Sequence, residues 1–151
     1  MTEYHLAQLN IAKAVDQIDS DTLAPFVALL DDINALAEAS PGFVWRLKDD
    51  TGNATAIGGF EDPRMIVNMS VWQGVEPLMD FVYRTAHTPV MARRREWFEV
   101  MSSAYQVLWW IEAGALPTIA EARERLAQLQ EQGPSERAFT FKARYPRPLA
   151  V

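Results

Sequence analysis

The sequence predicts an α+β domain with a ferredoxin-like antiparallel sheet that carries its helices on one face. Residues 4–11 alternate in polarity as a half-buried strand does, and residues 43–48, 65–73 and 105–112 also read as strands. Between them lie segments with apolar residues at helical spacing, in the order β-α-β-β-α-(α)-β-α-β. The first six regular elements, with one helix inserted, give the split β-α-β arrangement.

Cap and turn residues place the first two helices. Ser20-Asp21-Thr22 supplies N-cap candidates, and Pro25 fits the first turn of the helix that follows. Ser40-Pro41-Gly42 ends this helix, and 49–63 reads as turn and loop. Pro77 can begin the second helix.

The C-terminal third contains two further helices and a last strand. Thr88-Pro89 is a cap and first turn for a helix that carries Trp97 and Phe98 on one side. Thr118 and Glu121 match a capping box, which predicts a helix that runs to Gly133-Pro134. Alternation over 139–145 predicts a half-buried strand before a proline-rich tail.

Composition describes one globular domain over residues 1–151, with 49% hydrophobic and 23% charged residues. The absence of cysteine excludes disulfides, iron–sulfur clusters and thiol nucleophiles, and it suits a reducing cytosol. A net charge of −6 argues against nucleic acid as a partner. We find no signal peptide and no apolar stretch long enough for a bilayer, so we expect a cytoplasmic protein with no membrane partner.

Five segments carry a resemblance to a known family. They are SPGFVWRLKDD, DPRMIVNMSVWQGVEPLMDFVYRTAHTPVMARRREWF, VLWWIEAG, PTIAEARERL and GPSERAFTF, in this order. Together they resemble the bacterial domain-of-unknown-function family numbered 3291, which has no settled reaction. The resemblance implies a dimeric α/β barrel, as in antibiotic-biosynthesis monooxygenases and some haem-handling enzymes. Members of the family often carry a histidine after the VLWW strand, where this chain has Gly114-Ala115-Leu116.

The third strand has one apolar and one mixed face. Val67, Met69 and Val71 alternate with Asn68, Ser70 and Trp72. We expect the apolar face to meet the helices and the mixed face to look into a barrel formed with a second copy. An asparagine, a serine and a tryptophan in line are groups that a small-ligand pocket uses, and Gln8 and Asn10 of the first strand face the same way.

The resemblance implies more specific roles on this strand. Cofactor-free monooxygenases of the same fold group use an asparagine to position, and a tryptophan to stack on, a polycyclic substrate. Asn68 and Trp72 are the matching candidates here. The alternative is a polar dimer interface, and the two can coexist.

Two candidates for chemistry lie before the fourth strand. His87 is a candidate general base, substrate-binding residue or axial haem ligand, and its alternative is a structural cap. Tyr83, which lies beside it with Arg84, is a candidate for substrate binding. Arg94 lies on the apolar side of its predicted helix, where a guanidinium needs a carboxylate or an anionic ligand. It is a candidate for binding a substrate carboxylate or enolate, against a structural ion pair.

The tryptophans add aromatic area to the predicted pocket. Trp109 and Trp110 are neighbours on a strand and face opposite ways, so one of them joins the pocket. We name Trp109 as the candidate, although the sequence does not decide between the two. Together with Trp72 and Trp45 it would suit a flat aromatic or polyketide-like ligand.

Motifs for phosphate, dinucleotide and zinc-protease chemistry are missing, so no metal and no cofactor is expected. The sequence therefore predicts a homodimer that binds a small, largely apolar or aromatic molecule. One option is a cofactor-independent monooxygenase, isomerase or cyclase. The alternatives are a non-enzymatic ligand- or partner-binding protein and a haem-binding enzyme, and the sequence does not decide whether there is turnover.

Overall fold

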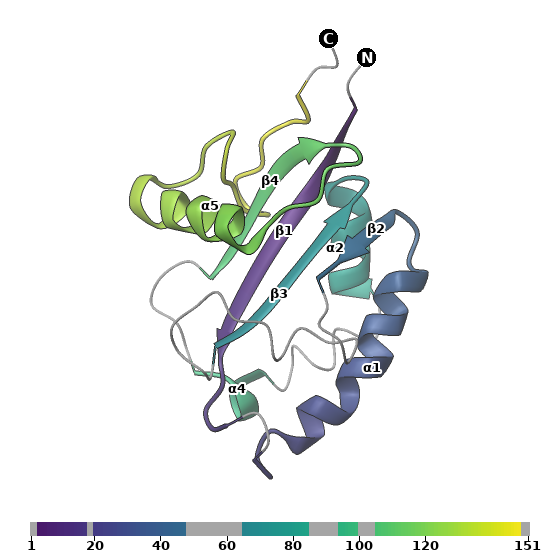
Figure 1. The fold of residues 1–151 in the computed structure, drawn as a ribbon, viewed down its shortest axis with the longest axis vertical. Helices are drawn as coiled ribbons and strands as arrows, with labels where there is room; N and C mark the ends of the chain where they lie inside the picture. Colours follow the sequence, from purple (N-terminus) through teal and green to yellow (C-terminus); the bar gives the residue numbers. More distant parts are fainter. Residues whose placement is uncertain (1–2, 18–19, 48–64, 85–93, 100–104, 149–151) are drawn as a thin grey trace.

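A computed structural model describes residues 3–17, 20–47, 65–84, 94–99 and 105–148 of the chain. Its strands are β1 (Tyr4–Lys13), β2 (Phe43–Arg46), β3 (Met65–Trp72) and β4 (Gln106–Glu112). Its helices are α1 (Ala24–Ala39), α2 (Val75–Arg84), α4 (Arg94–Trp97) and α5 (Ile119–Gln132). The strands form one sheet in the order β2-β3-β1-β4, with every neighbouring pair antiparallel (Figure 1). The α+β prediction is confirmed, and the topology is consistent with a ferredoxin-like fold.

Local signals explain most element ends. Pro25 lies in the first turn of α1, but the N-cap is Leu23, which has no side-chain cap bond. The predicted cap of α5 is confirmed, because the Thr118 hydroxyl accepts from the Glu121 amide at 3.1 Å. The helix predicted from Thr88 begins outside the described residues, and within them α4 covers Arg94–Trp97.

The predicted last strand over 139–145 is wrong. Only Phe139 pairs with the sheet, by an isolated bridge to Leu108 of β4. The Thr140 hydroxyl then accepts from the Ala143 amide at 3.0 Å and turns the chain away. Pro146 and Pro148, which follow, lack the amide hydrogens that a further ladder would need.

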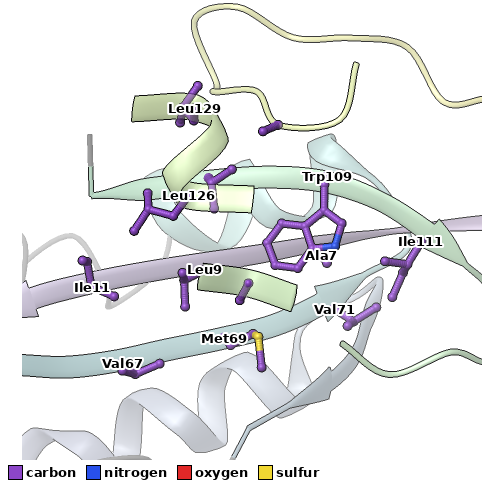
Figure 2. Packing of buried hydrophobic residues seen from close by; sticks show 13 residues of the cluster. Ala7, Leu9, Ile11, Val67, Met69, Val71, Trp109, Ile111, Leu126 and Leu129 are labelled. Carbon is purple, nitrogen blue, oxygen red and sulfur yellow. The ribbon is translucent and has the colours of Figure 1, made fainter. Parts of the chain in front are cut away.

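Helices pack on both faces of the sheet, which corrects the prediction that they share one face. On the apolar face, α5 packs on β4 and β1, and its Leu126 and Leu129 share one hydrophobic cluster with the predicted stripe of Val67, Met69 and Val71 (Figure 2). The reason is that α5 carries its own apolar stripe and follows directly on β4, so it folds back over the sheet.

The opposite, mixed face is covered by α1 and α2. Ala37 of α1 and Leu78 and Phe81 of α2 pack in one cluster with Leu6 and Trp72 of the sheet. A second cluster near the start of α1 joins Leu23 and Phe26 to Trp97 and Phe98. The mixed face is therefore an interior layer of a single chain, and the expectation that it lies open is wrong.

Among the described residues, no helix is both long and apolar enough to cross a membrane.

Candidate functional site

Five of the predicted site residues lie together on the face covered by α1 and α2. We call Gln8, Asn10, Asn68, Ser70 and Trp72 the polar cluster. The antiparallel register of β1 and β3 assembles it, because Gln8 pairs with Ser70, and Asn10 with Asn68. The cluster follows from strand alternation alone, and in this respect the sequence-based grouping is confirmed.

Hydrogen bonds join four members of the polar cluster. Gln8 Nε2 donates to Asn68 Oδ1 at 2.6 Å and to Ser70 Oγ at 2.8 Å. Trp72 Nε1 donates to the same Ser70 Oγ at 2.8 Å. Gln8 and Ser70 are only 4% and 7% exposed, so these bonds offset the cost of burying their polar atoms.

Two side chains of the polar cluster, Asn68 and Asn10, have polar groups that could bind a ligand. Asn68 is exposed although it lies at the middle of a central strand, so the helical layer does not close over it. Asn10 Oδ1 is buried and has no hydrogen-bond partner among the residues that the structure describes. A buried acceptor without a donor is rare in folded proteins, and a bound water or ligand can supply the missing donor.

Trp72 has no free face for a ligand. Its ring stacks on Phe81 of α2 at 5.4 Å between centroids and meets the edge of Phe43 at 5.4 Å. Only 1% of the residue is exposed. The predicted stacking role of Trp72 is therefore wrong for this structure, in which the residue is a core side chain that also orients Ser70.

Trp45 and Trp109 lie on the other face of the sheet, away from the polar cluster. Both pack into the cluster under α5, where Trp109 is fully buried. Its Nε1 donates to the Glu121 carboxylate at 3.2 Å, so the capping-box glutamate is used for this contact. The candidate role of both residues in a common pocket with Asn68 is wrong, because the sheet separates them.

Of the three remaining candidates, the structure describes the side chain of Tyr83 alone. Tyr83 lies on α2, is 55% exposed and contacts the edge of the Phe141 ring at 6.2 Å. His87 lies outside the described residues, as does the side chain of Arg94. No described group of three or more histidine, aspartate or glutamate side chains could hold a metal ion.

The sequence-based reasoning missed a groove around Trp110, the tryptophan that faces away from α5. One hollow, of about 1140 Å³, lies between α5 and the chain near Tyr145. A second, of about 530 Å³, lies between the same segment and the start of α2. Both are lined by Trp110, Tyr145, Pro146 and Arg147. The sequence feature that could have indicated this groove is the Pro146-Arg147-Pro148 segment that follows Tyr145.

Comparisons with known proteins give a family but no activity. The model of the family DUF3291, a domain of unknown function, matches residues 5–151. One solved structure, a Nitrosomonas europaea protein of unknown function called NE2512, is similar with a TM-score of 0.47 and 14% identity. That match covers 76% of this chain and 94% of the other. No curated protein matches.

Proposed function

The chain belongs to the DUF3291 family, and we propose that it binds a small molecule at the polar cluster, where Asn68 reaches solvent. The observation that carries the proposal is the buried Asn10 Oδ1 without a donor, on the strand position paired with Asn68. A ligand hydroxyl or amine would supply that donor.

The chemistry of the cluster narrows the class of ligand. Asn68 Oδ1 accepts a hydrogen bond from Gln8, so the Nδ2 donor of Asn68 points away from Gln8. The site thus offers one acceptor, on Asn10, and one donor, on Asn68. Apolar clusters flank it on both sides along the sheet. A hydroxylated aromatic or polyketide-like molecule with a nearby carbonyl fits these groups.

Binding is favoured over catalysis by the residue types of the polar cluster. Amide, hydroxyl and indole groups orient a ligand and stabilise an oxyanion, but they do not exchange protons near neutral pH. A cofactor-independent oxygenation, isomerisation or cyclisation would need a base beyond the cluster, for which His87 remains the candidate. A non-enzymatic ligand-binding protein needs nothing more than the described groups.

We expect Asn68→Ala to weaken ligand binding by about 1–3 kcal/mol, because it removes the Nδ2 donor that the proposed site offers to the ligand. The fold should lose little stability, since Asn68 is exposed and Gln8 Nε2, which loses Asn68 Oδ1 as an acceptor, keeps Ser70 Oγ. The measurement is a tryptophan-fluorescence screen of naphthols and hydroxylated polyketide-like aromatics, each paired with its O-methyl ether. The hydroxyl compounds should bind more tightly than their ethers, because only they donate to Asn10.

The control is Gln128→Ala, which removes an amide on α5, away from the cluster. It should leave both affinity and the unfolding midpoint unchanged. Equal binding of hydroxyl compounds and ethers, or unfolding caused by Asn68→Ala, would show that the polar cluster is structural only.

A cytoplasmic homodimer remains a prediction. The mixed face that we expected to meet a second copy is covered by α1 and α2 of the same chain, where Trp72 is buried. A dimer would have to use another surface. Sedimentation velocity at micromolar concentration should report twice the chain mass of 17.1 kDa, and a single species at the chain mass would contradict the prediction.

A further inference from the structure

The tail segment, Tyr145–Pro148, crosses the surface and separates the two hollows around Trp110. Trp110, Tyr145, Pro146 and Arg147 line both of them, so the hollows would form one continuous groove if the tail segment left. We call this surface the Trp110 groove. It lies on the outside of the molecule and shares no residue with the polar cluster.

Three hydrogen bonds and one cation–π contact, besides a ring contact of Tyr145 with Phe139, hold the tail segment in the Trp110 groove. Trp110 Nε1 donates to the Tyr145 carbonyl at 3.0 Å. The Arg147 guanidinium lies over the Trp110 ring at 5.1 Å from its centroid, and Arg147 Nη2 donates to the Gln73 carbonyl. The Tyr145 hydroxyl donates to the Pro134 carbonyl at 3.4 Å.

These contacts recognise features of any extended Pro-Arg-Pro peptide. The indole N–H takes a carbonyl that precedes a proline, and the indole face takes the guanidinium. The two prolines favour an extended backbone and lack amide hydrogens that the groove would otherwise have to satisfy. Aromatic-lined grooves that bind proline-rich segments work in this way.

The charges of the Trp110 groove favour a cationic occupant. Its lining carries four carboxylates, from Glu76, Glu124, Glu131 and Glu136. Apart from Arg147 itself, it carries three arginines, Arg125, Arg137 and Arg144. The guanidinium of Arg147 therefore completes the charge balance, and an empty groove would keep an excess of negative charge.

We propose that the Trp110 groove is a binding site for an extended, proline-flanked arginine segment of another protein, and that the chain's own tail segment occupies it in cis. The tail segment is the argument for the occupant, because it shows this chemistry seated on the groove. Since a tethered segment acts at an effective concentration of about a millimolar, it competes with any added peptide.

The test uses the full chain and a fluorescent acetyl-Tyr-Pro-Arg-Pro-Leu peptide, with binding followed by polarisation. Arg147→Ala weakens the hold of the tail segment and should bind the peptide at least tenfold more tightly than the wild type. A peptide with alanine in place of its arginine should not bind. Adding Trp110→Phe to Arg147→Ala should weaken binding several-fold, because the ring stays but the N–H donor is lost.

Three outcomes would overturn the proposal. The first is equal peptide binding by the wild type and Arg147→Ala, including no binding by either. The second is binding that does not change on adding Trp110→Phe, in a variant whose circular dichroism shows an intact fold. The third is a wild-type dimer that Arg147→Ala dissociates, which would assign the groove to the tail of a second copy.

Discussion

Gly42→Ala is expected to destabilise the fold by about 2–4 kcal/mol. Gly42 lies in the turn between α1 and β2 at a φ of 84°, a region that costs a non-glycine residue about 1–2 kcal/mol. An added Cβ would also lie 2.5 Å from Pro77 Cβ and 2.7 Å from Pro77 Cγ, which adds an overpacking cost of about 1–3 kcal/mol. The turn has little freedom to shift, since the Gly42 carbonyl accepts from the Gln73 amide at 2.7 Å.

The matched control for this prediction is Gly114→Ala. Gly114 has a similar φ of 92°, but nothing lies within 4 Å of an added Cβ. It should therefore show the backbone cost alone. Urea unfolding of both variants measures the difference, which reports the contact with Pro77. Equal losses of stability in the two variants would mean that α2 moves away from the turn at no cost.

Strand alternation was sufficient to predict the sheet but not what covers each face. The pattern of β3 correctly separates Val67, Met69 and Val71 from Asn68, Ser70 and Trp72. The pattern did not predict which layer packs on the polar face, because polar side chains on a strand do not always face a pocket or an interface. Gln8 and Ser70 instead satisfy each other inside the chain, and this depends on the register between β1 and β3, which no single strand contains.

The tryptophans were misplaced for a related reason. A register irregularity in β2 lies between Phe43 and Trp45, so Phe43 pairs with Trp72 while Trp45 pairs with Val71 on the other face. Trp109 faces α5 because it pairs with Ala7. Strand alternation predicts that Trp109 and Trp110 point to opposite faces. Only the pairing of β4 with β1 decides which of the two faces α5.

Trp72→Ala should cost about 3–5 kcal/mol of stability, the largest loss that we expect from a side-chain truncation in this chain. The residue is 1% exposed and its ring is packed against Phe43 and Phe81, so alanine leaves a cavity between the sheet and α2. Thermal and urea unfolding measure the loss. A loss below about 1 kcal/mol would mean that α2 does not rest on this ring.

Trp72→Phe separates packing from hydrogen bonding at the same position. It keeps a ring between Phe43 and Phe81 but removes the Nε1 donor to Ser70, for an expected loss of about 1–2 kcal/mol. Ser70 Oγ keeps Gln8 as a donor, so the polar cluster should hold its geometry and the affinity for naphthols should not change. A variant with unchanged stability and tenfold weaker naphthol binding would show instead that the indole reaches the ligand. In that case α2 must open away from Trp72 on binding, because the packed ring has no face to offer while Phe81 lies on it.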